Sequence, residues 1–404
     1  MKTNKDNFIP RDEALALLLN KWHPSPSTEM IHIEEALGRV TSEDIFSQNS
    51  LPVCRSSQVD GIAVRSADFV SDMPDTKNWV RGKDFVRADT GDDFDDRFDT
   101  VIRIEDISWG SNGQLNINDK ACVKKGNLIK QCGSMVKEND LLVAAQTRLT
   151  PIHLSVLAAG GIEMIPVYAK PRVVYIPTGN ELIPIGEKPK RGQNIETNGI
   201  MISNFLKQWG AEPINYPIVK DKIADLTTIL EKAVQEADIV LINGGSSKGE
   251  EDYSVRLMRE NGALLQHGIR AIPGKPVALG MLDNTPIINL PGPPLGTFYA
   301  MDWFVSALVH AFLKQPQPIR PKIKVTLCDT IIKPADYVDF EMFSRLVVKK
   351  SDTGYKASLL TWENNMPTMM TKCNSLLIVP AGITGYNAGD EKEVELLYGE
   401  EYIE

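Results

Sequence analysis

The residues best suited to chemistry lie in one short loop, where an apolar run ends in glycine, serine and acidic residues. Residues 239–242 are apolar, and residues 243–252 then read Asn-Gly-Gly-Ser-Ser-Lys-Gly-Glu-Glu-Asp. Consecutive glycines allow positive φ and let a ligand approach the backbone closely. Exposed amides and two hydroxyls would form an anion cradle, and the acids would hold Mg²⁺ beside a phosphate. An ordinary solvated strand-to-helix loop is the alternative, because isolated glycine motifs are weak signals.

Three further segments place a charged side chain beside turn residues. Glu181 ends a Thr-Gly-Asn-Glu turn, where it would hold a metal or orient a ligand; a surface or helix-capping glutamate is the alternative. Lys275 stands in Pro-Gly-Lys-Pro as a point charge suited to a phosphate or an oxyanion, unless it is a solvated hairpin lysine. Asp60 belongs to an Asp-Gly turn pair, and its carboxylate would alternatively reach a site from another domain.

Composition excludes several classes of protein. The net charge of -9 over 404 residues argues against a nucleic-acid-binding surface. The five cysteines are scattered, which favours free thiols in a reducing cytoplasm over a disulfide framework or a zinc site. The acidic run 89–106 lacks the spacing of an EF-hand loop. Neither a signal peptide nor a run of about 20 apolar residues is evident, so we expect a cytoplasmic protein that spans no membrane.

The elements that must position these residues alternate between strand and helix from residue 171 onward. Apolar runs typical of buried parallel strands occupy 173–176, 239–242 and 286–290. Such alternation predicts an open, doubly wound parallel sheet whose ligands bind beyond the carboxyl ends of the strands. We therefore expect the three following loops to meet at one edge of the sheet. These loops are 178–181, 244–252 and 291–296.

Helical spacing separates these strands. We expect one helix across 202–209 with Thr197 or Asn198 as its cap, and a second across 226–237 with Asp225 as its cap. A long apolar helix is expected from about 297 to 313. Short apolar runs before residue 145 predict a β-rich insert, and those beyond residue 318 predict a small β domain.

Taken together, several segments resemble the motifs of the molybdopterin molybdenumtransferases, the family of MoeA and of the E domain of gephyrin. Residues 57–65 resemble S-x-M-D-G-Y-A-V-R, residues 177–182 resemble T-G-D-E-L, and residues 244–252 resemble G-G-V-S-x-G-E-x-D. Residues 273–276 and 290–294 match P-G-K-P and L-P-G-N-P. Weaker matches follow the order of the family motifs through 86–91, 99–106, 126–133 and 192–198, and Arg345 stands where the family has a β-domain arginine.

The resemblance implies an α/β multidomain homodimer with four parts in each subunit. The first is an N-terminal linker and dimerisation domain, residues 1–50 and 145–170. The second is a β-rich inserted domain, residues 51–144. A molybdopterin-binding α/β domain follows at 171–317, and a small C-terminal β-barrel-like domain at 318–404. The active site is expected at the subunit interface, completed by the partner subunit's β-rich domain.

The implied reaction inserts molybdate into adenylylated molybdopterin and releases AMP, with Mg²⁺ present. Catalysis of such a displacement is mostly positioning and electrostatics. Molybdoenzymes or cofactor chaperones are the implied protein partners. The implied catalytic residues are Asp60 from the other subunit, Glu181, Asp252 and Lys275, of which Glu181 and Asp252 are the metal ligands. The implied ligand-binding residues are Thr178, Gly179, Gly244, Gly245, Ser246, Ser247, Gly249, Pro291, Gly292 and Arg345.

The departures from the family motifs gather at the implied pocket. Asn180 replaces an acid, Ile272 replaces a lysine, Pro293 replaces an asparagine, and Lys248 replaces an apolar residue. These changes favour a divergent paralogue, and they leave open whether the oxyanion is molybdate or tungstate. The main alternative to an insertase is therefore a molybdopterin carrier or chaperone with altered or no activity. A structural assembly protein is the third hypothesis.

Overall fold

The computed structural model describes residues 7–244, 253–352, 354–361 and 370–403. These residues form two compact units. The larger unit contains residues 7–27 and 169–403, and the smaller contains residues 28–168. In the described part of the chain, the helices are all too short or too polar to cross a membrane.

A six-stranded sheet forms the centre of the larger unit, in the order β15-β12-β16-β20-β19-β17. The four strands β15, β12, β16 and β20 run parallel to one another, which confirms the predicted doubly wound parallel core. β19 and β17 add an antiparallel edge that was not predicted from the sequence, because no helical pattern separates their short apolar runs. The strands are β12 (Arg172–Pro177), β15 (Glu212–Asn215), β16 (Ile239–Asn243), β17 (Leu264–His267), β19 (Ala278–Leu282) and β20 (Thr285–Leu290).

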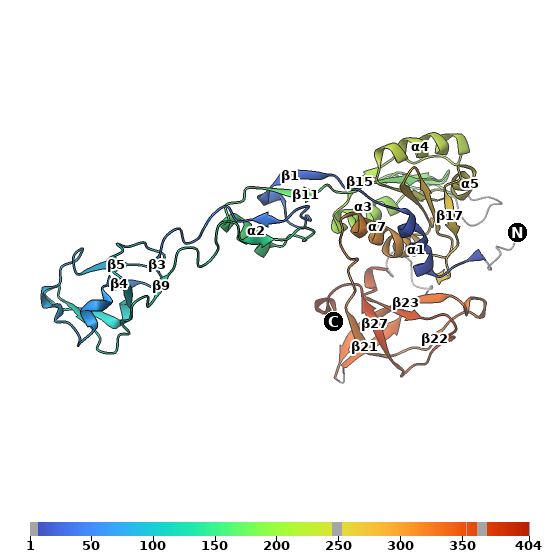
Figure 1. The fold of residues 1–404 in the computed structure, drawn as a ribbon. Helices are drawn as coiled ribbons and strands as arrows, with labels where there is room; N and C mark the ends of the chain where they lie inside the picture. The colour runs from blue at the N-terminus through green and yellow to red at the C-terminus, as the bar shows by residue number, and fades with distance from the viewer. Residues whose placement is uncertain (1–6, 245–252, 353, 362–369, 404) are drawn as a thin grey trace. The chain divides into compact units, whose positions relative to one another are not determined.

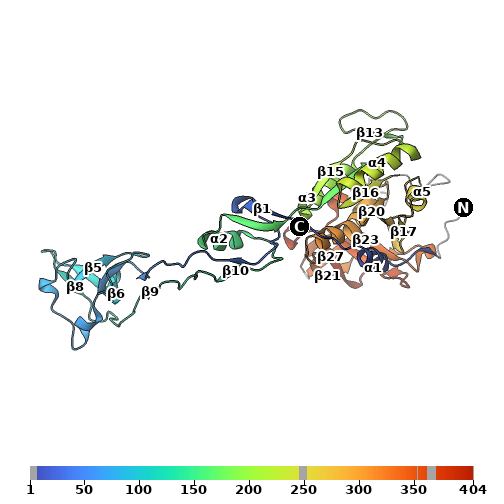
Figure 2. The same ribbon diagram turned by 45° about the horizontal axis from the view of Figure 1, so that its top comes forward.

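Helices cover both faces of this sheet. Figures 1 and 2 show α4 and α5 on one face, where Leu230 and Met258 are buried against strand residues such as Val240. The other face carries α3, α1 and a long helix whose three consecutive segments are α6, η6 and α7. The helices are α1 (Arg11–Lys21), α3 (Asn198–Trp209), α4 (Ile223–Glu236), α5 (Tyr253–Glu260), α6 (Pro294–Ala300), the π-helix η6 (Met301–Val305) and α7 (Ser306–Phe312).

Three details of these helices differ from the sequence predictions. Thr197 precedes α3 without a side-chain cap, and the Glu196 carboxylate instead accepts from Gly199 N at 2.9 Å. Asp225 lies inside the first turn of α4, whose N-cap is Lys222. The long helix begins at Pro294 rather than near 297, because proline is well suited to the first helical turn.

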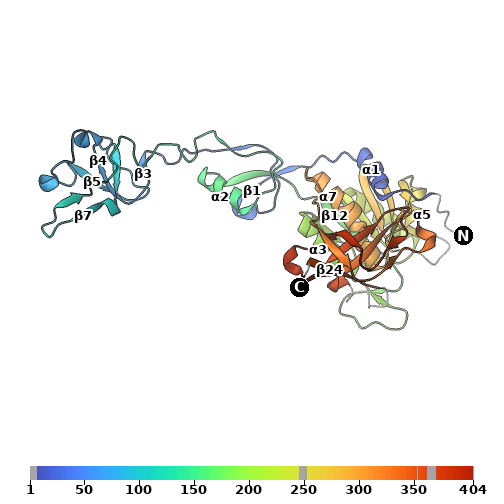
Figure 3. The same cartoon turned by 90° about the horizontal axis from the view of Figure 1, so that it is seen from below.

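A closed β-barrel sheet follows the α/β part, as predicted for the C-terminal domain (Figure 3). It closes because β23 pairs with both β24 and β25. The two-residue strand β18, which precedes Pro273, pairs with β23 and so joins the barrel to the α/β part. The strands are β18 (Ala271–Ile272), β21 (Lys322–Leu327), β22 (Ile331–Ile332), β23 (Glu341–Ser351), β24 (Gly354–Leu359), β25 (Ser375–Val379), β26 (Gly385–Tyr386) and β27 (Glu391–Leu396).

The smaller unit has separate hydrophobic clusters around Leu157 and around Phe98. Its one α-helix in the described chain, α2 (Pro151–Ala159), starts at a capping box between Thr150 and His153. The strands are β1 (Thr28–His32), β2 (Ile45–Phe46), β3 (Ser56–Ser57), β4 (Gly61–Val64), β5 (Phe85–Ala88), β6 (Thr100–Arg103), β7 (Ile107–Trp109), β8 (Leu115–Ile117), β9 (Ile129–Lys130), β10 (Leu141–Val143) and β11 (Met164–Tyr168).

Short elements complete both units. The larger unit has the strand pair β13 (Leu182–Ile183) and β14 (Asn194–Ile195), and the 3₁₀ helices η7 (Ala335–Tyr337) and η8 (Glu400–Tyr402). The smaller unit has η2 (Ile33–Glu35), η3 (Ser66–Phe69), η4 (Thr76–Asn78) and η5 (Ile104–Asp106). α1 packs against β17 and β19 and so groups with the α/β part, whereas residues 1–50 were predicted to belong to the linker domain. The other predicted boundaries stay predictions.

Candidate functional site

One buried side chain, Asn243 at the end of β16, holds the ends of three parallel strands together. Its Nδ2 donates to Pro291 O at 2.7 Å and to Leu290 O at 3.3 Å. Its Oδ1 accepts from Tyr175 Oη at 3.0 Å and from Asn198 Nδ2 at 2.7 Å. The carboxamide therefore links β12, β16, β20 and the start of α3. A buried amide whose nitrogen and oxygen are both hydrogen-bonded holds its neighbours in place, because any displacement would leave polar groups unpaired.

A second layer of hydrogen bonds surrounds Asn243. Asn198 Nδ2 also donates to Gly292 O at 2.8 Å, so the loop after β20 is tied to α3. The Tyr175 hydroxyl oxygen also lies 2.9 Å from Glu196 Oε1, so its single proton is shared between this carboxylate and Asn243 Oδ1. Burial, followed by the charge of Glu196, raises the pKa of Tyr175 far above its usual range. The hydroxyl therefore remains a proton donor at neutral pH.

The loops after β12 and β16 approach each other so closely that glycine is required. Thr178 N donates to Asn243 O at 2.8 Å. Gly244 adopts φ of +124°, and a Cβ there would come within 2.2 Å of Thr178 O. Gly179 N donates to Val219 O at 3.1 Å, which brings the loop after β15 to the same edge. A side chain at position 244 would thus force the two loops apart.

The structure therefore gathers Thr178, Gly179, Gly244, Pro291 and Gly292 at one edge of the sheet, where the sequence pattern predicted them. The remainder of the glycine loop lies outside the described residues, and its roles stay predictions. Those residues are Gly245, Ser246, Ser247, Lys248, Gly249 and Asp252.

A pair of carboxylates lies at the same edge, and only one of them was predicted from the sequence. Glu181 is exposed, and Asp221 is partly buried in the loop after β15. Asp221 Oδ2 accepts from Asn180 N at 3.3 Å, and Asp221 N donates to Asn180 Oδ1 at 3.3 Å. Burial, and then repulsion from Glu181, raise the pKa of Asp221 above its usual value. Extending the strand-end rule to the edge strand β15 would have identified Asp221 from sequence.

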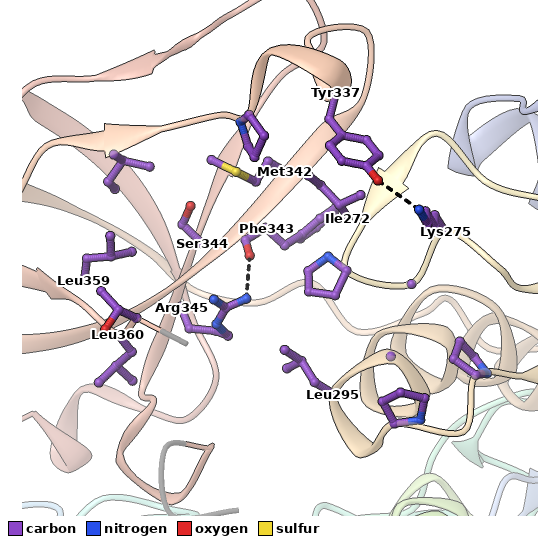
Figure 4. A pocket seen from close by; sticks show the side chains of 18 of the residues that line it. Ile272, Lys275, Leu295, Tyr337, Met342, Phe343, Ser344, Arg345, Leu359 and Leu360 are labelled. Carbon is purple, nitrogen blue, oxygen red and sulfur yellow. Dashed lines mark hydrogen bonds between the residues drawn. The ribbon is translucent and has the colours of Figure 1, made fainter. Parts of the chain in front are cut away.

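A cavity of about 590 Å³ lies between the α/β part and the barrel, and Figure 4 shows the side chains that line it. Lys275 Nζ donates to Tyr337 Oη at 2.8 Å at one side of the cavity. Arg345 is only 6% exposed, and its Nη1 donates to Phe343 O at 3.5 Å. Most other walls are apolar, and Pro293 lines the cavity as well. The apolar side chains include Ile272, Leu295, Ile331, Met342, Leu359 and Leu360.

The remaining predicted residue, Asp60, belongs to the smaller unit. Its Oδ1 accepts from Thr90 N at 2.7 Å and from Thr90 Oγ1 at 2.9 Å. These hydrogen bonds, with a contribution from Arg87, lower the pKa of the exposed Asp60 carboxylate. The next residue, Gly61, has to be a glycine, because a Cβ there would come within 1.9 Å of Ile102 O on β6. The Asp-Gly turn therefore holds one ionised carboxylate at the surface of this unit.

The fold and these features define a multidomain α/β protein whose candidate ligand site lies at the ends of parallel strands. Residues 9–161 match the MoeA N-terminal region (domain I and II), and residues 175–311 match a probable molybdopterin binding domain. The chain belongs to the MoeA family.

Relatives and solved structures agree with these matches. The chain is 28% identical over 326 residues to a molybdopterin molybdenumtransferase of Haemophilus influenzae, covering 78% of this chain and 80% of the relative. It is 24% identical over 410 residues to the enzyme of the same name from Bacillus subtilis, covering 96% and 94%. A crystal structure of a molybdopterin biosynthesis MoeA protein from Pyrococcus horikosii is similar with a TM-score of 0.79 at 27% identity, covering 97% of this chain and 100% of that one.

Proposed function

We propose that this protein acts in molybdenum cofactor biosynthesis as a molybdopterin molybdenumtransferase. The proposed reaction inserts the metal of molybdate into adenylylated molybdopterin and releases AMP. The observation that carries this proposal is the convergence of three strand-end loops on Asn243, in a chain similar to enzymes of that name. The loops present Thr178, Gly244 and Gly292 at the edge where α/β sheets bind their ligands.

In this proposal the strand-end loops bind the phosphate groups of the substrate. Gly244 permits close approach of the backbone, since a side chain there would collide with Thr178 O. Gly292 is exposed, and a Cβ at this position would have no atom within 4 Å, so a ligand has room beside it. Fixed backbone dipoles stabilise a charged transition state without the cost of reorganising solvent.

The carboxylate pair fits a bound Mg²⁺. Asp221 Oδ1 is buried and has no hydrogen-bond partner among the described residues. Repulsion between Glu181 and Asp221, together with the burial of Asp221, disfavours two negative charges here unless a cation is bound. Mg²⁺ prefers such hard oxygen ligands and usually shares them with substrate phosphates. We propose that Glu181 and Asp221 hold Mg²⁺ with Asp252, and that the ion would neutralise charge on the reacting phosphate.

The cavity beside Lys275 is the proposed site for the oxyanion and the adjoining part of the pterin. Lys275 and Arg345 bring two positive charges to walls that are otherwise mostly apolar. Low polarity strengthens each charge interaction with an anionic ligand. Tyr337 Oη orients the Lys275 ammonium through their 2.8 Å hydrogen bond. Because Ile272 contributes an apolar wall, the charge available to an oxyanion rests mainly on these two side chains.

We further propose that the active protein is a homodimer in which Asp60 of one subunit completes the site of the other. Asp60 is exposed, ionised and held in one orientation by Thr90, as a carboxylate presented to a neighbour would be. The smaller unit has its own hydrophobic clusters, so it is able to carry this turn independently of the sheet.

The deciding experiment measures AMP released from adenylylated molybdopterin by the full-length protein. We expect release that requires both molybdate and Mg²⁺, together with transfer of molybdenum to the pterin detected by elemental analysis. Tungstate in place of molybdate tests the choice of oxyanion in the same assay. AMP release that is independent of molybdate, or tight molybdopterin binding without turnover, would contradict the proposed reaction.

A further inference from the structure

Two exposed cysteines of the smaller unit lie in the two segments that continue a β-ladder. β3 and β9 are antiparallel, with Ser57 paired to Ile129 and Ser56 paired to Lys130. Cys54 lies two residues before β3 in a bend, and Cys132 lies two residues after β9 in a turn. The ladder therefore brings the segments that carry the two thiols together from positions far apart in sequence.

Contacts beyond the ladder confirm that the two segments stay adjacent there. Gly133 N donates to Pro52 O at 2.9 Å. The Cys132 thiol donates to Val53 O at 3.0 Å, which is the carbonyl of the residue before Cys54. The Cys132 thiol is also among the groups that raise the pKa of Cys54, after burial and Asp93. Both residues are exposed and both are free thiols in this structure.

We propose that Cys54 and Cys132 form a reversible dithiol–disulfide site that reacts with small-molecule disulfides. One thiolate attacks a sulfur of the small disulfide, which forms a mixed disulfide and expels one small thiolate. The second cysteine then attacks the protein sulfur of the mixed disulfide, which forms the Cys54–Cys132 bond and expels the second small thiolate. The two protein thiols are oxidised, one small disulfide is reduced, and the two thiol protons pass to the released thiolates.

The surroundings of the pair determine which reagents it accepts. Desolvation and the Asp93 carboxylate, which interacts with the Cys54 thiol, raise the pKa of Cys54, and Asp96 adds to this effect. Thiol–disulfide exchange requires a thiolate, so these acids slow reactions that begin at Cys54. They also repel anionic disulfides and attract cationic ones. Cystamine, which carries two ammonium groups, should therefore react faster than oxidised glutathione, which is an anion.

A disulfide at this position would join the two chain segments that connect β3–β9 to the rest of the smaller unit. The closed loop would contain β4, β5 and β6 with their hydrophobic cluster. Cross-linking of this kind restricts the unfolded chain and so stabilises the enclosed part.

The test equilibrates the full-length protein in buffers of cystamine and cysteamine and then blocks the remaining thiols. Digestion without reduction should give a peptide pair linked through Cys54 and Cys132. Half-oxidation of this pair should need at least about tenfold less cystamine than mixed-disulfide formation at Cys122, because the second step is intramolecular. Oxidation should also raise the urea concentration at which half of the smaller unit is unfolded.

Two variants make the result decisive. In Cys132→Ser, the reaction at Cys54 should stop at the mixed disulfide with cysteamine, and the rise in the urea midpoint should disappear. Cys122→Ser is the matched control, since Cys122 is another exposed cysteine of the same unit, and it should leave the cross-link intact. Separate mixed disulfides at Cys54 and Cys132 in the wild type, without a cross-link, would overturn the proposal. This result would not bear on the proposed transferase reaction.

Discussion

The two regions that supply the proposed charged groups hold their carboxylates in opposite ways. At the strand ends of the larger unit, burial and Glu181 raise the pKa of Asp221. In the turn of the smaller unit, hydrogen bonds from Thr90 lower the pKa of Asp60. Asp60 is thus kept ionised by its own neighbours, whereas burial and Glu181 outweigh the opposite effects of Asn180 and Lys220 on the pKa of Asp221. The difference fits the proposed roles, in which a cation binds beside the strand-end pair and Asp60 acts as an anion without one.

The largest expected effect is the loss of activity when the proposed site carboxylate of either region is replaced. Asp60→Asn and Glu181→Gln should each reduce AMP release by about 100-fold to 1000-fold, the usual cost of losing one electrostatic contact in the transition state. Co-refolded mixtures of the two variants should regain about a quarter of wild-type activity, since half of the dimers would contain one intact site. Mixtures no more active than either variant would exclude a site shared between subunits.

Removing Asp221 tests the proposed cation site directly. Asp221→Asn should raise the Mg²⁺ concentration needed for half-maximal activity by about tenfold or more, because one anionic oxygen ligand is lost. Asp225→Asn is the control, since Asp225 is an exposed acid in the first turn of α4. Equal Mg²⁺ requirements in the wild type and both variants would show that Asp221 does not hold the ion.

Breaking the Asn243 network tests how far the strand ends depend on one side chain. Asn243→Ala should lower the free energy of unfolding by about 2–3 kcal/mol, because Tyr175, Asn198 and Pro291 would lose buried hydrogen bonds. Asn204→Ala is the control, since the exposed Asn204 side chain donates to Ile200 O within its own helix. Urea unfolding measures both variants, and similar losses for the two would contradict a special role for Asn243.

The smallest effect is a difference in pH dependence between the two carboxylates. The raised pKa of Asp221 means that its contribution to stability is greatest when it is protonated and is lost as pH rises through the folded pKa. Asp221→Asn should therefore gain stability relative to the wild type as pH rises above about 4 in chelator-treated buffer. The lowered pKa of Asp60 has the opposite sign, so the cost of Asp60→Asn should shrink as pH falls below about 4. Parallel pH profiles of urea unfolding for the two variants would refute this contrast.

Much of the framework was predictable from sequence because local rules determine it. Apolar runs bounded by turn residues identified β12, β16 and β20. The strand-end rule then placed Thr178, Gly244 and Gly292 at one edge. The antiparallel edge strands β17 and β19 and the π segment of the long helix were missed, because their sequences lack a period that distinguishes them.

The sequence by itself determined the family, the parallel core and the identity of most candidate residues, since these depend on motifs and spacing along the chain. Tertiary structure alone decided which polar groups meet. It turned Asn198 away from a capping role toward Asn243, placed Asp221 where Glu181 affects its pKa, and brought the Cys132 thiol to the carbonyl of Val53, beside Cys54. Such meetings depend on strand order and register over long sequence separations. Local propensity carries no information about them, because it reports only on neighbouring residues.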